Sequence, residues 1–380
     1  MTVNEWDSWR PGVLNKEQIK ALGNSGKLER FDLETLDHSA IDLHISDIGH
    51  KMKGSVKPLN DGDISSVILS FKDKDENFKR DGKFYLEKAQ TYIFQVEESL
   101  NLEKTKISGQ ATGKSTYGRL DILTRLLTNY SVSFDTVAKG YKGSLWVEVT
   151  PITFPVIIEP GVALNQLRLF KGEPGNCHIK EEELSLWGDL IVNQKDSKEE
   201  KQDNLTLSLD EDPILKNNIC AFKARSNEEK NFIDLTKDFS QDNDRYDPKL
   251  YWESVAVSSK EKYLPIETEK FYILRSRERF TLPKSVAVYC QAVTETLGEL
   301  RIHYAGFVHP LFGQGRVDRK GAPLIFEVRG HNIGTILRHG ETLAKLEYYW
   351  MSQDAAEEKK ESPYNNQELT LSKIFKEWEG

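Results

Sequence analysis

The segment TGKSTYGRLDILTRL, residues 112–126, gathers side chains that could hold an anion or assist a proton transfer. Lys114, Ser115 and Arg119 lie within six residues of one another, beside glycines. A Walker phosphate loop, GxxxxGK[ST], needs a second glycine five residues before the GK pair, but Ser108 stands there. The two cations can still bind phosphate, because charge-assisted hydrogen bonds do not require the Walker geometry.

A helix cap is the structural alternative for the same segment. Ser115 or Thr116 could cap a helix that begins near Tyr117, since hydroxyl side chains are favoured at N-caps. Lys114 and Arg119 would then lie near the helix start, where the helix dipole disfavours positive charge. An anionic ligand would resolve this conflict, because helix N-termini and nearby cations together favour anions. The segment therefore predicts an anion-binding site.

Glu148, in GSLWVEVTP, is the second chemical group. Alternation along a strand would place Glu148 and Trp146 on one face and three apolar side chains on the other. Glu327 holds the corresponding place in PLIFEVRG, which is even more apolar. A glutamate present in both segments indicates a buried or pocket position, or an ion pair common to the two. A partly desolvated carboxyl has a raised pKa and can act as a general base near neutral pH.

Antiparallel β-strands are the elements predicted to hold these residues. The segments concerned have a period of two, β-branched residues, and Gly, Pro, Asn or Asp at their boundaries. The predicted strands are AIDLHIS, SSVILSF, TYIFQV, SLWVEV, FPVIIEP and NQLRLF. The predicted helices are LNKEQIKALGNSGKL near the start, ILTRLLTNY, and an amphipathic one in the tail SPYNNQELTLSKIFKEWEG.

The second half of the chain repeats the first. A segment that begins at Tyr92 aligns without gaps with one that begins at Tyr272, an offset of 180 residues. Identical pairs include Tyr92/Tyr272, Ile93/Ile273, Glu98/Glu278, Leu102/Leu282, Lys104/Lys284, Gly118/Gly298 and Leu120/Leu300. Glu148 then aligns with Glu327 at an offset of 179. The register holds over about seventy residues, which indicates a duplicated domain.

The two copies differ where the chemistry would lie. Ser115 aligns with Glu295, and Arg119 aligns with Glu299, so the second copy lacks both the hydroxyl and the cation. Chemistry that needs both groups is expected only in the first copy. The predicted organisation is a first domain over 1–192, a charged linker or loop over 193–204, and a second, degenerate domain over 205–380. We call residues 1–192 the first copy and residues 205–380 the second copy.

The bulk composition limits the partners and the compartment. The 380 residues suffice for two domains, and a net charge of −8 argues against a broad nucleic-acid surface. Cys177, Cys220 and Cys290 are scattered, as is typical of a reducing compartment. The N-terminus lacks the apolar region of a signal peptide, and no apolar run approaches the ~20 residues that span a bilayer. We expect a cytoplasmic protein with neither nucleic-acid nor membrane partners.

GKSTYGRL, followed by GYKGSLWVEV and PGVALNQLRLF, resembles the deoxycytidine triphosphate deaminases, relatives of the trimeric dUTP diphosphatases. SAIDLHISD resembles the family's first core strand, and the degenerate second copy resembles its long two-domain bacterial form. The resemblance implies a mainly β fold: a duplicated, dUTPase-like distorted β-barrel of jelly-roll type, with a few short helices, assembled as a homotrimer. The implied reaction is hydrolytic removal of the 4-amino group of dCTP, giving ammonia and dUTP for dTMP synthesis.

The same resemblance implies roles for individual residues. Glu148 falls on the glutamate that activates the attacking water and carries its proton. Ser115 and Arg119 fall on the serine and arginine that position this water and stabilise the tetrahedral centre. The implied substrate-binding residues are Lys114, Thr116, Asp135, Trp146, Val147 and Gln166.

Three of these substrate positions carry particular expectations. Lys114 replaces a phosphate-binding arginine, so the charge is kept but the bidentate fork is lost. Trp146 and Val147 belong to the strand that reads the base edge. The family's sugar-binding aspartate falls on Ala138, and Asp135, three residues earlier, is the expected substitute.

The resemblance also bears on metals. Zinc deaminases require H-x-E and PCxxC motifs, and this chain contains no CxxC. The expectation is therefore no zinc, with Mg²⁺ bound only through the substrate triphosphate. His303 and His309 lack partners at metal-ligand spacing and are predicted to be structural or interface residues.

Two rival functions stay open. A dUTP diphosphatase activates water with an aspartate in a turn resembling D-x-D-Y-x-G, where this chain has Ala138, and the glycine-rich C-terminal arm is missing. A bifunctional deaminase and diphosphatase is compatible with the sequence. The other rival is a non-catalytic nucleotide-binding regulator, against which the joint presence of Ser115, Arg119 and Glu148 argues.

Overall fold

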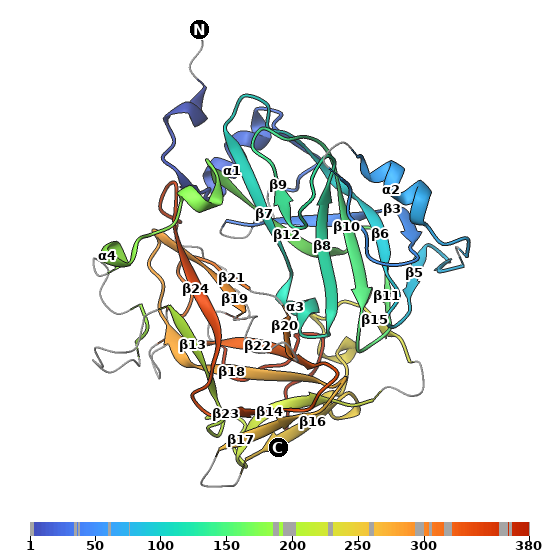
Figure 1. The fold of residues 1–380 in the computed structure, drawn as a ribbon, viewed down its shortest axis with the longest axis vertical. Helices are drawn as coiled ribbons and strands as arrows, with labels where there is room; N and C mark the ends of the chain where they lie inside the picture. Colours follow the sequence, from blue (N-terminus) through green and yellow to red (C-terminus); the bar gives the residue numbers. More distant parts are fainter. Residues whose placement is uncertain are drawn as a thin grey trace.

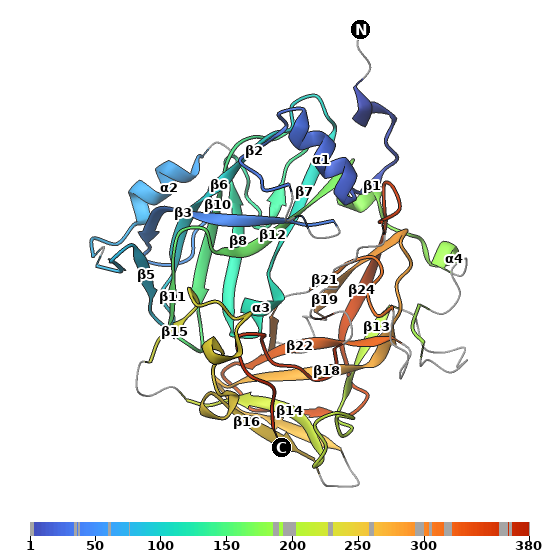
Figure 2. The ribbon, with the colours of Figure 1, turned by 180° about the vertical axis from the view of Figure 1, so that it is seen from behind.

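The structure, a computed structural model, consists mainly of β-strands in two large and two small sheets (Figure 1, Figure 2). It describes residues 4–33, 36, 39–59, 62–75, 77–184, 190–192, 203–226, 231–257, 262–292, 300–303, 306–314, 321–356, 364 and 367–379. Residues 193–202 of the predicted linker lie outside the described residues, and so do Glu295 and Glu299. The mainly β fold is confirmed. No described helix is long and apolar enough to cross a membrane.

The first large sheet holds the strands of the first copy. Its order is β8-β10-β6-β3-β12-β7-β9, with β1 paired to β12 and β2 paired to β6. The strands are β1 (Gly12–Val13), β2 (Leu28–Glu29), β3 (Ile41–Lys51), β6 (Tyr92–Asn101), β7 (Ile107–Gly113), β8 (Ile122–Thr128), β9 (Thr136–Val137), β10 (Lys142–Pro151) and β12 (Ala163–Lys171). Alternation along β10 is as predicted, because Val147 packs in the main core while Trp146 packs in a separate cluster.

The second large sheet repeats this arrangement. Its order is β16-β14-β18-β13-β24-β19-β21, and β22 pairs with β18 and β20. The strands are β13 (Asn204–Ser208), β14 (Ile219–Ala224), β16 (Trp252–Ala256), β18 (Phe271–Phe280), β19 (Val286–Ala292), β20 (Leu300–His303), β21 (Phe307–Val308), β22 (Ala322–Gly330) and β24 (Thr342–Trp350). The order β22-β18-β13-β24-β19-β21 parallels β10-β6-β3-β12-β7-β9 in the first sheet. The repeat in the sequence is therefore a repeat of strand order.

The two copies interlock. In one small sheet, β15 (Ile233–Asp234) of the second copy pairs with β11 (Val156–Ile158) of the first, beside β5 (Lys83–Leu86) and β4 (Lys79–Arg80). The other small sheet pairs β17 (Tyr263–Ile266) with β23 (Thr335–Arg338). The largest hydrophobic core includes Leu120 and Leu126 of the first copy together with Trp252, Phe271 and Ile273 of the second. Because each fully buried side chain of this size contributes about 1.5–3 kcal/mol, this shared core holds the copies together.

Helices are short and few among the described residues. The α-helices are α1 (Lys16–Asn24), α2 (Ile64–Phe71), α3 (Ser115–Gly118) and α4 (Glu181–Leu184). Single 3₁₀ turns occupy Glu5–Ser8, Pro174–Asn176, Asp242–Asp244 and Pro248–Leu250. The helix predicted near the start is confirmed as α1, where Asn15 Oδ1 accepts the Gln18 amide at 3.0 Å and Gln18 Oε1 accepts the Asn15 amide.

The strand predicted for SSVILSF is wrong, because this segment forms α2. Asp63 Oδ1 accepts the Ser66 amide at 2.7 Å and caps the helix. Ile64 and Ile68, four residues apart, are buried on one side, so the apolar run follows a helical period.

The helix predicted for ILTRLLTNY is also wrong, because Ile122–Thr128 form strand β8. Asp121 has a φ of +60°, which ends the α3 turn and redirects the chain. β8 then pairs with β10, with Arg125 opposite Glu148. The leucines of this segment suit either period, and pairing in the sheet decides between them.

The tail does not form the predicted amphipathic helix. Tyr364 and residues 367–379, which we call the C-terminal strap, contain no helix. Leu369, Leu371 and Phe375 are buried in the main core, and Phe375 forms an isolated bridge with Tyr246. The strap therefore packs on the main core as an irregular segment, held by buried apolar side chains.

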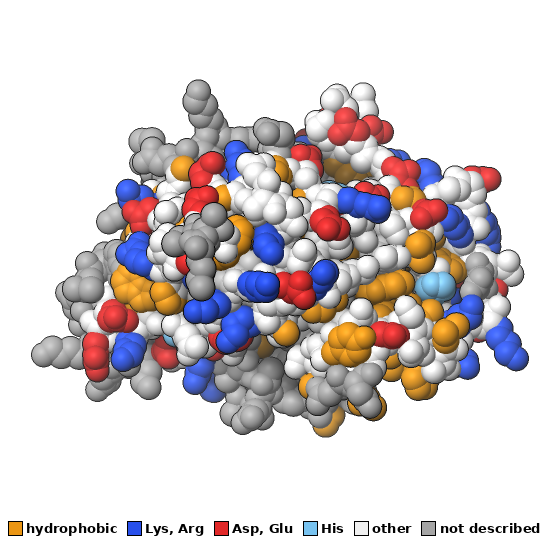
Figure 3. Space-filling view, turned by 90° about the horizontal axis from the view of Figure 1, so that it is seen from above, with side chains coloured by type: hydrophobic (Ala, Val, Ile, Leu, Met, Phe, Trp, Pro, Cys, Tyr) orange, Lys and Arg blue, Asp and Glu red, His pale blue; other side chains and the backbone are white. Residues whose placement is uncertain are grey.

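On the face seen in Figure 3, acidic and basic side chains are interspersed with hydrophobic ones. This mixture agrees with the modest net charge of −8.

Candidate active site between the two copies

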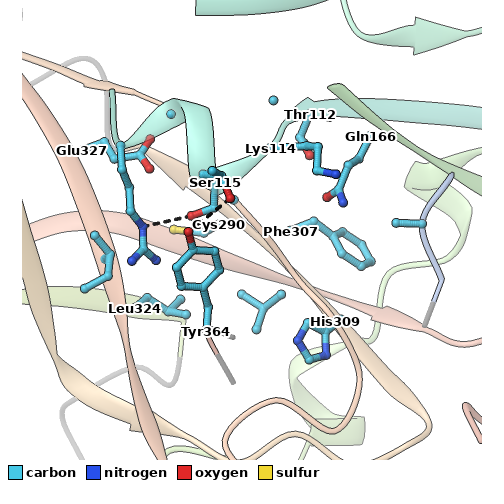
Figure 4. Close-up of a pocket in the computed structure, with 18 of the residues that line it drawn as sticks. Thr112, Lys114, Ser115, Gln166, Cys290, Phe307, His309, Leu324, Glu327 and Tyr364 are labelled. Atoms are coloured by element: carbon cyan, nitrogen blue, oxygen red, sulfur yellow. Dashed lines mark hydrogen bonds between the residues drawn. The ribbon is translucent and has the colours of Figure 1, made fainter. Parts of the chain in front are cut away.

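A cavity of about 270 Å³ lies where the first copy meets the second (Figure 4). This volume is near the lower end of the roughly 300–1,000 Å³ typical of small-molecule sites. The first copy lines the cavity with residues of β3, β7, α3 and β12. The second copy adds residues of β19, β21, β22, β24 and the C-terminal strap. Figure 1 and Figure 2 both show α3 next to β22.

The α3 turn pairs a hydroxyl with a guanidinium. β7 ends at Gly113, and α3 follows with Lys114 as its N-cap residue. The predicted cap by Ser115 or Thr116 is therefore wrong, since the helix begins at Ser115 itself. The turn carries the Arg119 side chain back over Ser115, so that Arg119 Nε donates to Ser115 Oγ at 3.1 Å.

The C-terminal strap holds the remaining atoms of the Arg119 guanidinium. Arg119 is 2% exposed; its Nη1 donates to the Thr370 carbonyl at 2.8 Å and its Nη2 to Gln367 Oε1 at 2.6 Å. The Tyr364 ring stacks on it at 4.1 Å. Burial lowers the pKa of Arg119, but an arginine with this many partners stays charged. The cation is thus fixed in place beside the Ser115 hydroxyl.

Glu327 faces this pair from β22. Its carboxyl lies against Gly118, where an added Cβ would come within 2.4 Å of Glu327 Oε2. Burial raises the pKa of Glu327 to about 8, the Arg119 charge opposes the rise, and the Asp121 charge adds to it. Glu327 is 5% exposed and lines the cavity beside Arg119 and Gly118. It is a desolvated acid with room for a ligand beside it.

The opposite end of the cavity is polar and carries two cations. Lys114 forms an ion pair with Asp42, which also accepts from Gln166 Nε2 at 3.0 Å. Arg168 Nη2 donates to Gln166 Oε1 at 3.2 Å, and its guanidinium stacks on Phe307 of the second copy at 3.9 Å. In Figure 4, Glu327 and Gln166 lie on opposite sides of Ser115. This end could accept an anionic group, because a phosphate can pair with Lys114 in place of the carboxylate.

Five of the predicted site residues line the cavity: Lys114, Ser115, Thr116, Arg119 and Gln166. Thr116 Oγ1 lies 3.1 Å from the Tyr364 hydroxyl, with which it shares a hydrogen bond.

Glu148, Trp146, Val147 and Asp135 do not line this cavity, although all four are described residues. Glu148 Oε1 accepts from Ser55 Oγ at 2.9 Å, within the first copy. Burial raises the pKa of Glu148 and, to about 7, that of Asp135. Within one chain, these residues do not meet Ser115 and Arg119, so their substrate roles stay predictions.

Comparison with known proteins shows the family of this chain. A family model described as "2'-deoxycytidine 5'-triphosphate deaminase (DCD) N-terminal domain" matches residues 10–173, and one for the C-terminal domain of the same deaminase matches residues 180–375. The chain belongs to the deoxycytidine triphosphate deaminase family. The crystal structure of 2'-deoxycytidine 5'-triphosphate deaminase from Agrobacterium tumefaciens is similar over 91% of this chain and 97% of that chain, with 27% identity and a TM-score of 0.79. A search of curated proteins gives no match.

The match to this deaminase fits the dUTPase-like fold predicted from the sequence. The site predicted from the sequence and the cavity in the structure differ mainly in the glutamate that they contain. Glu327, not Glu148, lines the cavity with Ser115 and Arg119, and its alignment with Glu148 was the signal that could have pointed to it; the catalytic role of Glu148 stays a prediction.

Tyr364, Gln367 and Arg168 were also missed. The first two belong to a tail whose sequence resembled a helix, and Arg168 lies two residues after Gln166, the one residue of that strand predicted to be near the nucleotide. His309, predicted to be a structural or interface residue, lines the cavity between the two copies.

Among the described residues, no group of three or more His, Cys, Asp or Glu side chains could hold a metal ion. The expectation that Mg²⁺ arrives on the triphosphate is untouched by this observation.

Proposed function

We propose that this member of the deaminase family removes the 4-amino group of dCTP by hydrolysis, and that Glu327 is the acid–base residue. The observation that carries the proposal is the meeting of Glu327, Ser115 and Arg119 in one desolvated cavity. The carboxyl comes from one copy, and the hydroxyl and guanidinium come from the other. The chemistry is therefore completed within one chain.

The reaction needs one proton carrier and one fixed cation. Water attacks C4 of the cytosine ring while Glu327 takes a proton from it and passes this proton to N3. In the second stage, the same carboxyl takes the proton of the new C4 hydroxyl and delivers it to the amino group, the C4–N bond breaks, and ammonia leaves as the C4 carbonyl forms. Ser115 positions the water, and Arg119 stabilises charge that develops at the ring, because a preorganised cation acts strongly in a water-poor site.

The raised pKa of Glu327 suits this cycle. A carboxyl with a pKa of about 8 holds a transferred proton well near neutral pH and can also release it. Only the ionised form can take a proton from water. We therefore expect kcat/KM to rise with pH, to reach half of its plateau near pH 8, and to level off about one pH unit higher.

The polar end of the cavity would receive the phosphates. Lys114, released from Asp42, and Arg168 supply positive charge there, and Gln166 supplies an amide. In this proposal Mg²⁺ enters as part of the nucleotide triphosphate. The homotrimer and the cytoplasmic location remain proposals that rest on the family resemblance and on composition.

A matched pair of glutamine variants tests the assignment. Glu327→Gln keeps the shape of the side chain but cannot carry a proton, so ammonia release from dCTP should fall by about 10²–10⁴-fold. Binding of dUTP, measured by calorimetry, should stay within about threefold of wild type. Glu148→Gln, made at the aligned position of the first copy, should retain most of the turnover.

The other outcomes are informative. Loss of turnover in Glu148→Gln with activity retained in Glu327→Gln would return the role to Glu148, in a site shared with a second chain. Pyrophosphate release from dUTP would indicate the diphosphatase. Tight binding of dCTP with neither product would indicate a regulator.

A further inference from the structure

A buried ion pair joins the two copies directly behind the cavity. Arg329 Nη1 donates to Asp121 Oδ2 at 2.7 Å, with Arg329 7% and Asp121 0% exposed as side chains. Thr153 Oγ1 completes the cluster, donating to Asp121 Oδ2 at 2.6 Å and lying 3.0 Å from Arg329 Nη1. Glu269, which is mostly exposed, accepts from Arg329 Nη2 at 3.1 Å.

Both partners of this pair are directly linked to the candidate active site. Asp121 lies two residues after Arg119, and its amide donates to the Gly118 carbonyl at 2.8 Å, so it belongs to the turn that carries Ser115. Arg329 lies two residues after Glu327 on β22 and therefore projects from the same face of the strand. The ion pair thus ties the hydroxyl–guanidinium turn to the carboxyl-bearing strand.

We propose that Asp121 and Arg329 form a positioning clamp that fixes Glu327 against the Ser115–Arg119 turn, so that the three groups act on one ligand. This inference rests on the proposed deamination for its kinetic consequences. Its structural part concerns only how the two copies are locked together.

The sequence repeat supports a specific role for the clamp. Continuing the two alignments, Asp121 corresponds to Arg301 and Arg329 corresponds to Thr150. The reverse pairing, in which the turn of the second copy meets β10 of the first, would place Arg301 near Thr150 and would have no ion pair. The clamp therefore selects the arrangement in which the intact turn, with Ser115 and Arg119, receives a glutamate.

The clamp is also a source of charge near Glu327. Asp121 raises the pKa of Glu327, and Arg119 lowers it. Other ionisable groups come from several elements around the cavity. They are Tyr364 and Lys373 of the C-terminal strap, His309 after β21, Cys290 on β19, and Asp42, Lys114 and Arg168 at the polar end, with Arg329 on β22 itself. On β20, His303 pairs with Glu327 through the backbone register.

Charge substitutions in the clamp test the proposal. Asp121→Asn keeps the size of the side chain but removes its charge, and Arg329→Met does the reverse. We expect kcat for ammonia release to fall by about 10- to 100-fold in both variants, because small displacements of catalytic groups have effects of this size. The affinity for dUTP should change by less than about threefold.

The titration of Glu327 separates positioning from simple loosening. Removing the Asp121 charge should move this titration to lower pH by about 0.5–1 unit, and removing the Arg329 charge should move it to higher pH. A merely loosened interface would admit water and move it to lower pH in both variants. Opposite shifts therefore support the clamp, and shifts in the same direction, or none, overturn it.

The titration of Glu327 can be followed without turnover. Glu327→Gln is made in the wild type and in each clamp variant, and the resulting difference in melting temperature is measured as a function of pH. Failure of deamination would appear as absence of ammonia release by the wild type, and it would leave this thermal test intact. In Arg329→Lys, which keeps the charge, Glu327 should titrate as in the wild type. If Arg329→Met does not fold, this variant provides the test, and a shifted titration in it would overturn the clamp. Glu269→Gln, at the exposed partner of Arg329, is the control and should leave both readouts unchanged.

Discussion

Glu327 should destabilise the folded protein in its ionised form, so that Glu327→Gln stabilises the protein at neutral and alkaline pH while abolishing turnover. The pKa of this carboxyl is raised from 4.5 to about 8 by burial. A group with a raised pKa in the folded state contributes its full stability below the unfolded pKa and loses it as pH rises through the folded value. The neutral amide of glutamine avoids this loss.

The magnitude follows from the size of the shift. At 1.36 kcal/mol per pKa unit, the interval from 4.5 to about 8 corresponds to about 5 kcal/mol above pH 8 and about 3 kcal/mol at pH 7. These figures are upper bounds, since the Arg119 guanidinium and entering water relax around the ionised carboxylate. For 380 residues, an unfolding entropy of ~2.1 cal/mol/K per residue converts each kcal/mol into about 1.3 °C of melting temperature.

Thermal unfolding of both proteins from pH 4.5 to pH 9 provides the measurement. The difference in melting temperature should be near zero at pH 4.5, rise to about 4 °C at pH 7, and reach about 6 °C at pH 9. Glu97→Gln, an exposed position on β6, is the matched control and should show no pH-dependent difference. A difference for Glu327→Gln that stays flat across this range would refute the buried carboxyl with a raised pKa on which the proposed chemistry depends.

Two further outcomes are expected. Gly118→Ala, whose Cβ would lie 2.4 Å from Glu327 Oε2, should destabilise the protein by about 1–3 kcal/mol and reduce ammonia release; Gly175→Ala, whose Cβ meets nothing within 4 Å, should do neither. Lys114→Met should weaken dCTP binding about tenfold, the loss of one charge-assisted hydrogen bond, but leave deoxycytidine binding unchanged, and equal losses for the two ligands would contradict a phosphate role for Lys114.

Strand periodicity and the internal repeat were enough to predict the fold class and the duplication. The errors fell where local pattern was ambiguous. ILTRLLTNY has leucines that suit a helix or a strand, and the sheet partner β10 settles its conformation. SSVILSF has an apolar run too short to distinguish the two periods, and the Asp63 cap that favours a helix lies just outside it.

The tail illustrates a different limit. Its apolar residues have a spacing that suits a helix, but in the structure they are buried at separate points along the core that the two copies share. Tertiary contacts override the weak helix preference of such a short segment. Because Gln367 and Tyr364 reach Arg119 only through this path, no local pattern could have indicated their place in the site.

The position of the acid depends on how the copies dock, and the sequence specifies docking only indirectly. The repeat made Glu148 and Glu327 equivalent, and family resemblance favoured the one in the copy that retains Ser115. A turn and a strand of the same copy need not meet, however, because α3 projects from the end of β7 toward the other copy. The docking-specific feature is the charge asymmetry that remains after alignment. Asp121 and Arg329 form an ion pair, whereas the aligned residue types, arginine at 301 and threonine at 150, carry no opposite charges. In a duplicated chain whose site lies between copies, the residues that break the repeat are therefore more informative about the catalytic partner than the residues that preserve it.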